Sequence, residues 1–166
     1  MDELILKAKN GDKTSFTELM LQIKEELYKV AKIRLRNDDD VFDAIQETML
    51  VSYKSLKKLK NNQYFKTWVI KILINECNKI YNYKNKKKLC SDDMLDNVNV
   101  CTRDNMEEKL NFEFICSKLN KEDGTIILLY YMENYTDKEI GKILNLNENT
   151  VRTKRTRAKE KIKKYL

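Results

Sequence analysis

Residues 135–164 read YTDKEIGKILNLNENTVRTKRTRAKEKIKK, and this stretch predicts a helix-turn-helix. Thr136 with Glu139 three residues later forms a capping box, which opens a short helix over 137–144. A turn of three residues follows, and a second helix begins near Glu148. A short helix, a tight turn and a basic second helix make up the motif whose second helix enters the major groove of DNA.

The second helix is strongly basic. Between Arg152 and Lys164 it carries eight Lys or Arg residues against the single acid Glu160. A basic helix that only faces solvent is the plainer alternative, but the patterned helix before it favours DNA binding. Arg152 and Arg157 could read guanine edges or hold phosphates, and the sequence leaves both roles open.

Arg155 is out of place on this helix. Its spacing puts it on the inward stripe with Val151, Ala158 and Ile162, which are apolar. We expect Arg155 to snorkel to the surface, to contact DNA from a rotated helix, or to meet a partner. The sequence does not decide among these three.

Composition narrows the function classes. The 166 residues include 33 basic and 26 acidic side chains, and the net charge of +7 favours a polyanionic partner, although solubility alone also explains a basic chain. The chain has no His, which excludes Ser-His-Asp catalysis and His metal ligands, and its three glycines lie too far apart for a phosphate loop. Four cysteines without a CxxC pair indicate reduced thiols in a cytoplasm, and we expect neither a metal nor a cofactor. No apolar run approaches the length of a membrane span.

Two helical blocks flank a polar middle, which predicts an all-α fold of two small domains, 1–88 and 109–166. The segment 89–108 between them is the expected linker. From Ser91 to Glu108 it holds six acids against one base, and its apolar residues have no period. We therefore expect this acidic segment to be flexible.

The first block predicts a short helix over 2–10, a second one capped by Asp12 or Ser15, a third over about 40–60, and a fourth from about Tyr64 into the eighties. The third helix has an expected apolar seam at Phe42, Ile45, Met49, Ser52, Leu56 and Leu59. The inward candidates on the fourth include Trp68, Ile72 and Ile80.

The second block resembles region 4 of the extracytoplasmic-function (ECF) group of sigma factors, in the sigma-70 family. The matching stretch runs from Leu119 to Lys164 and includes the apolar run at 126–131 and the helix-turn-helix. In the first block, residues 43–48 (DAIQET) resemble region 2.2, and residues 65–72 (FKTWVIKI) with Asn75 resemble regions 2.3 to 2.4. Both regions stand in the family's order and spacing, and together they cover nearly the whole chain.

The resemblance implies a non-enzymatic sigma factor that binds core RNA polymerase, recognises the −10 and −35 promoter elements and promotes promoter melting. The residues implied for the clamp helices of the polymerase β′ subunit are Asp43, Gln46, Glu47 and Leu50. The residues implied for contact with the −10 element are those of the loop that begins near Lys60, together with Tyr64, Phe65, Lys66, Trp68, Lys71 and Asn75. The residues implied for contact with the −35 element are Thr150, Arg152, Thr153, Thr156 and Arg157.

The same resemblance implies further partners and a location. It implies contact with the polymerase β flap, an anti-sigma factor, and a monomer when free, in the cytoplasm at the nucleoid or held at the membrane by the anti-sigma factor. Three positions depart from the family pattern: Lys79 stands where an acid is usual, Asn82 where an Arg is usual, and Arg155 where an apolar residue is usual. Core packing is the alternative role for Phe65 and Trp68, and we expect Trp68 to lie at least partly in the core.

Two other classes of protein fit the sequence less well. A free-standing activator or repressor would need its own dimerisation or ligand domain, and the first block looks like neither. A nuclease without His would need ordered carboxylates to hold a metal, and the acidic cluster of this chain is the expected linker.

Overall fold

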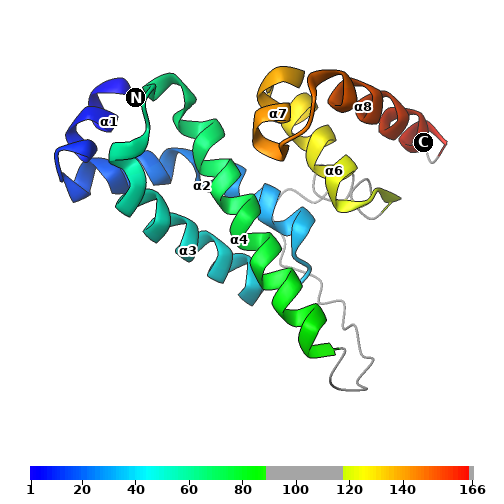
Figure 1. Ribbon diagram of the computed structural model, residues 1–166, viewed down its shortest axis with the longest axis horizontal. Coiled ribbons are helices and arrows are strands. Elements are labelled where there is room, and N and C mark those ends of the chain that lie inside the picture. Colours follow the sequence, from blue (N-terminus) through cyan, green and yellow to red (C-terminus); the bar gives the residue numbers. More distant parts are fainter. Residues whose placement is uncertain (89–117, 165–166) are drawn as a thin grey trace. The chain divides into compact units, whose positions relative to one another are not determined.

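The protein is described here from a computed structural model, which describes residues 1–88 and 118–164. The chain divides into two compact units, Met1–Leu89 and Cys90–Leu166. Within the described residues all regular structure is helical, which confirms the expected all-α fold (Figure 1). The expected linker, residues 89–108, lies outside the described residues.

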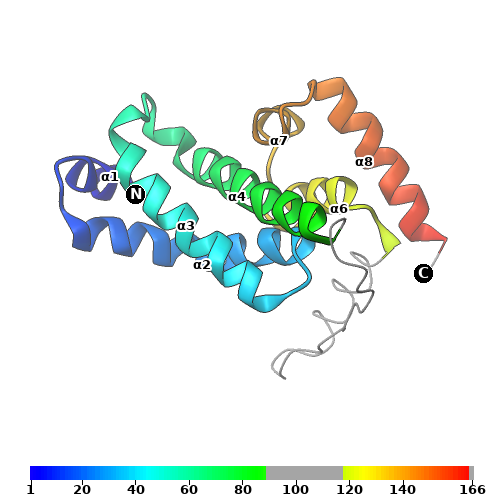
Figure 2. The ribbon, with the colours of Figure 1, turned by 60° about the horizontal axis from the view of Figure 1, so that its bottom comes forward.

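The first unit is a bundle of four helices with two short 3-10 turns. In chain order these are α1 (Asp2–Lys9), α2 (Lys13–Arg34), α3 (Asp38–Ser55), η1 (Leu56–Lys58), η2 (Asn62–Tyr64) and α4 (Phe65–Lys88). The long helix α2 packs against α1, α3 and α4, and α3 runs along α4 (Figure 2). This arrangement leaves one side of α3 and one side of α4 facing outward.

Asn and Asp side chains start the long helices of this unit. Asp12 caps α2, with its carboxylate accepting from the backbone amide of Thr14 at 3.0 Å. Asn37 caps α3 in the same way, through the amide of Asp39 at 2.8 Å. Gly11, between α1 and α2, has a φ of +99°, a backbone conformation that favours glycine. The tight α1–α2 corner therefore depends on local sequence.

The apolar seam expected along α3 is wrong in its first half. Phe42 is 54% exposed, and Ile45 and Met49 are only half-buried. The positions that α3 buries are mostly small: Val41, Ala44, Thr48 and Ser52. Small residues let neighbouring helices approach closely, and the Thr48 hydroxyl donates to the Ala44 carbonyl at 2.6 Å. The predicted seam was chosen by its large apolar residues, and its first three positions each lie one residue after a position that is buried in the structure.

The last positions of that seam, Ser52, Leu56 and Leu59, are buried as predicted. On α4, the expected inward residues Trp68, Ile72 and Ile80 are half-buried at the margin of the stripe. The fully buried apolar positions of α4 are Phe65, Val69, Ile70, Leu73 and Cys77.

The second unit contains the predicted helix-turn-helix. Its described elements are α6 (Lys121–Ile127), the π-helical turn η3 (Leu128–Met132), α7 (Asp137–Leu144) and α8 (Glu148–Lys163). Both α6 and α7 pack against α8. The helix α8 contributes Val151 and Ala158 to the core, each 0% exposed.

The turn between α7 and α8 is set by two residues. Asn145 ends α7 with a φ of +56°, in the left-handed region that Asn tolerates better than most residues. A Cβ at Gly141 would lie 2.7 Å from the backbone carbonyl oxygen of Leu146, a contact that no side chain can make. Glycine at 141 therefore allows the turn to pack closely on α7. This close packing sets the direction in which α8 continues.

Candidate nucleic-acid interface

The residues expected to face the −35 element lie together on α8. Thr150, Arg152, Thr153, Thr156 and Arg157 are all exposed. Four of them line one shallow depression with Glu160. Asn147 caps the helix through the amide of Asn149 at 2.9 Å, so α8 begins just before these side chains. The structure thus presents one polar and basic face near the start of α8.

Arg155 finds its partner inside the chain. Its guanidinium donates to both carboxylate oxygens of Asp137 on α7, each at 3.0 Å, and stacks over the ring of Tyr130 at 3.8 Å from the centroid. The Arg155 side chain is 17% exposed and that of Asp137 is 10% exposed. The hydrogen bonds to Asp137 raise the pKa of Arg155, against the opposing effect of burial. Of the three outcomes expected from the sequence, the partner is the one observed, and it joins α8 to α7.

Asp137 also reaches the exposed arginine beside it. The Nε of Arg152 lies 3.7 Å from the second carboxylate oxygen of Asp137, and its terminal nitrogen lies 3.4 Å from Glu148. Arg152 nevertheless remains 59% exposed. The two acids therefore orient the guanidinium along the surface of α8 and leave it free to meet a ligand.

Other basic residues of α8 are tied to α6. Lys154 forms an ion pair with Glu122 at 2.8 Å, and the hydrogen bond to Glu122 raises the pKa of Lys154. Lys161 lies 4.0 Å from Asp123, which is 9% exposed. The basic run of α8 is therefore divided by the fold. Lys154 and Arg155 are half-buried and join α8 to α6 and α7, whereas Arg152 and Arg157 remain exposed.

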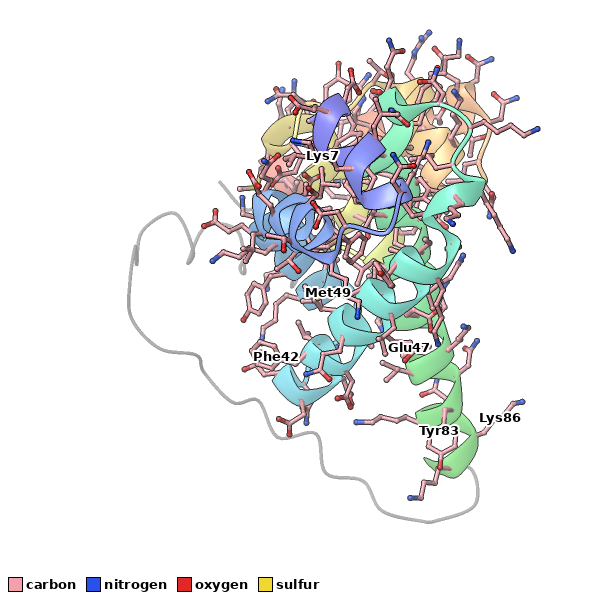
Figure 3. The ribbon with its side chains drawn as sticks, turned by 90° about the vertical axis from the view of Figure 1, so that its left-hand side faces the viewer. Lys7, Phe42, Glu47, Met49, Tyr83 and Lys86 are labelled. Atoms are coloured by element: carbon pink, nitrogen blue, oxygen red, sulfur yellow. The ribbon has the colours of Figure 1, made fainter. Side chains whose placement is uncertain are left out.

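The residues expected to contact polymerase share the outer side of α3. Asp43, Gln46, Glu47 and Leu50 are all exposed, and Leu50 is 53% exposed. Phe42 lies on the same helix and is 54% exposed, with its ring 6.3 Å from that of Tyr28 (Figure 3). Sequence reasoning missed Phe42 as a surface residue because it assigned the residue to the seam. The result is a surface that joins acids to large apolar side chains.

The residues expected at the −10 element divide between surface and core. Phe65 is 0% exposed, and its ring packs in the core at the start of α4, which is the alternative role given for it from the sequence. Tyr64 is 41% exposed, and Lys66 and Asn75 are also exposed. Trp68 is half-buried, as expected for a partly core residue, with its ring 6.3 Å from that of Phe65.

One face of α4 continues this site beyond Asn75. Trp68, Lys71 and Asn75 recur at spacings of three and four residues, and the same spacing continues through Lys79, Asn82 and Lys86. Lys79 bonds to Glu76 at 2.8 Å, yet its side chain is 69% exposed. Figure 3 labels Lys86 near the end of the helix. The two departures from the family pattern that fall on α4, Lys79 and Asn82, therefore lie on an outward polar face.

In the part of the chain that the structure describes, no helix has the length and apolarity needed to cross a membrane.

Both units of the chain match known protein families. The family model "Sigma-70 region 2" matches residues 19–88, and "Sigma-70, region 4" matches residues 112–162. RNA polymerase sigma factor SigV of Bacillus subtilis is 26% identical over 153 residues, which is 92% of each chain. ECF RNA polymerase sigma factor SigW of the same organism is 25% identical and covers 98% of this chain and 94% of its own. The ECF RNA polymerase sigma-E factor of Haemophilus influenzae is 26% identical and covers 96% and 91%.

Solved structures share the fold at lower identity. The sigma factor RpoE, in complex with the anti-sigma factor NepR from Bartonella quintana, superposes with a TM-score of 0.80 at 17% identity, over 90% of this chain and 94% of that chain. CnrH, in complex with the cytosolic domain of CnrY, superposes with a TM-score of 0.73 at 19% identity, over 98% and 94%.

Proposed function

Since the chain belongs to the sigma-70 family and is an ECF sigma factor of transcription initiation, we propose that three of its exposed surfaces each bind a different target during initiation. The surface of α8 reads the −35 element, the loop before α4 and the outer face of α4 read the −10 element, and α3 binds core polymerase. The protein acts by binding and not by catalysis.

The single observation that carries the −35 assignment is the division of basic residues on α8. Lys154 and Arg155 are half-buried and pair closely with acids of α6 and α7. Arg152, which also lies 3.7 Å from Asp137, and Arg157 stay exposed beside three Thr side chains. A recognition helix needs such an arrangement, because pairing on its inner side fixes its angle while the outer side stays free for base edges. Arg152 and Arg157 are the residues proposed to contact guanine or phosphate.

The −10 assignment rests on exposed aromatic and amide side chains at the start of α4. A base that leaves the duplex loses stacking worth a few kcal/mol, and a stacking partner on the protein restores about 1–3 kcal/mol. Tyr64 is exposed, and Trp68 is half-buried. We assign these two side chains to unstacked bases, and Lys66, Lys71 and Asn75 to the strand that carries them. Promoter melting follows from capture of the open strand.

The polymerase assignment rests on the mixed character of the α3 surface. Protein interfaces commonly combine an apolar centre with a polar rim. Phe42 and Leu50 supply exposed apolar area, and Asp43, Gln46 and Glu47 surround it with polar and acidic groups. This surface suits a partner helix that offers both apolar and basic residues, as proposed for the β′ clamp helices. The second unit is proposed to meet the β flap.

The structural relatives support a further partner. RpoE is described in complex with an anti-sigma factor, and CnrH with the cytosolic domain of CnrY. We extend this to the present chain and propose an anti-sigma factor that holds it inactive, with the free protein a monomer. The working location is the cytoplasm at the nucleoid, with retention at the membrane when such a partner is anchored there.

Run-off transcription with purified core polymerase tests the proposal. Wild-type protein should direct transcripts from a small set of fragments of its own genome, and the variant Asp43→Lys/Glu47→Lys should direct far fewer. Core-dependent initiation from shared −35 and −10 sequences is the expected result. If the wild-type protein directed no initiation with any core polymerase offered, the proposal would be wrong.

A further inference from the structure

We propose that Lys9 of α1 is a positioning residue for the loop that reads the −10 element, an inference that rests on the proposed function of that loop. The loop comprises residues 59–64, between η1 and α4, and is called the α3–α4 loop below. Lys9 lies before the first residue of the matched sigma region, 19–88, and no role follows for it from the sequence.

The contact is direct and bridges distant parts of the chain. The ammonium group of Lys9 donates to the backbone carbonyl of Leu59 at 2.7 Å and to the side-chain oxygen of Asn62 at 2.7 Å. The two partners lie 50 and 53 residues away in sequence. Lys9 is half-buried, so water competes less for these charged hydrogen bonds than it would at an open surface.

The loop also has local hydrogen bonds that set its shape, and Leu59 at its start is buried. The amide of Leu59 donates to the Leu56 carbonyl at 3.1 Å, and the amide of Tyr64 donates to the Asn61 carbonyl at 3.2 Å. The Asn61 side chain also accepts from the amide of Gln63 at 3.0 Å. These bonds join near neighbours. The bonds from Lys9 hold both the start of the loop and its middle to another helix, two residues before Tyr64.

The helix α1 can serve as this support because it is itself fixed. Ile5 and Ala8 are 0% and 4% exposed, and α1 packs on α2. The amide of Asp12, the residue that caps α2, donates to the Lys7 carbonyl at 3.1 Å. The helix also contacts η1 and η2 directly. Packing therefore fixes α1 on α2, and Lys9 fixes the loop on α1. Support of this kind from rigid elements keeps a binding side chain such as Tyr64 in place.

The test compares Lys9→Met with Lys7→Met in the holoenzyme. Lys7 is the matched control, because it lies on the same helix and pairs with Glu3 at 2.7 Å, with its side chain 55% exposed. We expect Lys9→Met to lower the binding of a single-stranded non-template −10 oligonucleotide about tenfold, which corresponds to about 1.4 kcal/mol. The loss should be smaller for oligonucleotides whose −10 bases are substituted, so base preference should flatten. Core affinity and the −35 preference should stay unchanged, as should all properties of Lys7→Met.

Two further variants separate positioning from general stability. Lys9→Arg keeps a charged donor and should recover most of the −10 binding. Asn62→Ala removes one acceptor from the loop side, and combined with Lys9→Met it should cost less than the sum of the two single changes, since both remove the same contact. If Lys9→Met failed to fold, Asn62→Ala with Lys9 intact would still be expected to weaken −10 preference.

The outcomes are distinct. If Lys9→Met and Asn62→Ala both kept wild-type −10 preference while the wild type initiated transcription, the role of Lys9 would be refuted and the proposed function would stand. Full additivity of the two changes would also refute it. Failure of the wild-type holoenzyme to bind the oligonucleotide would instead refute the proposed function of the loop.

Discussion

Replacing Arg155 by Met should unfold the second unit at a lower temperature and leave the first unit intact. Arg155 makes two charged hydrogen bonds to Asp137 and stacks on Tyr130, and both members of the ion pair are mostly buried. Loss of one partner from a buried pair costs about 3–5 kcal/mol, because the other charge is left without compensation. Here Arg152 lies 3.7 Å from Asp137 and can take over part of the pairing. We therefore expect a loss of about 2–3 kcal/mol in the free energy of unfolding of the second unit.

The size of the unit makes this loss easy to see. For a domain of 60–100 residues, each kcal/mol lowers the melting temperature by about 4–8 °C, so the expected shift is about 10–20 °C. The full-length protein should be followed by far-UV circular dichroism and by tryptophan fluorescence. Its single tryptophan, Trp68, lies in the first unit, so fluorescence reports that unit alone.

Lys163→Met is the control, since it removes a charge from the exposed end of the same helix. It should shift neither transition by more than about 0.5 kcal/mol, the usual limit for surface substitutions. A circular dichroism transition for Arg155→Met that coincided with wild type would refute the reasoning. It would mean that the pair with Asp137 contributes nothing net, and that another contact sets the angle of α8.

Three further predictions follow from the exposed surfaces and the expected linker. Asp43→Lys/Glu47→Lys should weaken core binding at least about tenfold without a change in melting temperature, since both residues are exposed; full affinity in titrations with labelled core would count against the α3 surface. Arg152→Ala should relax selectivity at one −35 position by about 1–3 kcal/mol, and Lys163→Ala should not; equal weakening on all sequences in binding assays with holoenzyme would assign Arg152 to phosphate. Limited proteolysis should cut first within the acidic stretch 91–108, because its sequence lacks the apolar period of a packed helix, and equal cutting within residues 1–88 and 118–164 would contradict that prediction.

The elements that depend on local sequence could be predicted from it. The capping box of Thr136 and Glu139 forms as expected, with the Glu139 carboxylate accepting from the Thr136 amide at 2.9 Å. The exposure of the four α3 residues expected to contact polymerase was also predictable, because helical spacing places them off the apolar seam, whereas the exposure of Phe42 was missed. Asn145 and Gly141 lie within the same short segment, so the turn between α7 and α8 has local causes as well.

The errors and omissions concern contacts between distant elements. Which residues of α3 are buried depends on how closely α2 and α4 approach this helix. The sequence pattern of α3 does not determine those distances. Phe65 sits in a motif that resembles a DNA-binding one, but packing takes its ring into the core. The pairing of Arg155 with Asp137 and that of Lys9 with Asn62 join separate helices or loops, and periodicity within one element does not reveal such partners.

The most direct test of the central claim is a promoter footprint of the purified protein with and without core polymerase. A sigma factor with one short recognition helix should protect duplex promoter weakly by itself, with an affinity that falls steeply as salt rises. Addition of core should produce tight protection over both elements and permanganate-reactive thymines near −10, because the bases that we propose the α4 surface reads are exposed only in the open duplex. Strong and specific protection by the protein alone, unchanged by core, would contradict the account and indicate a free-standing regulator.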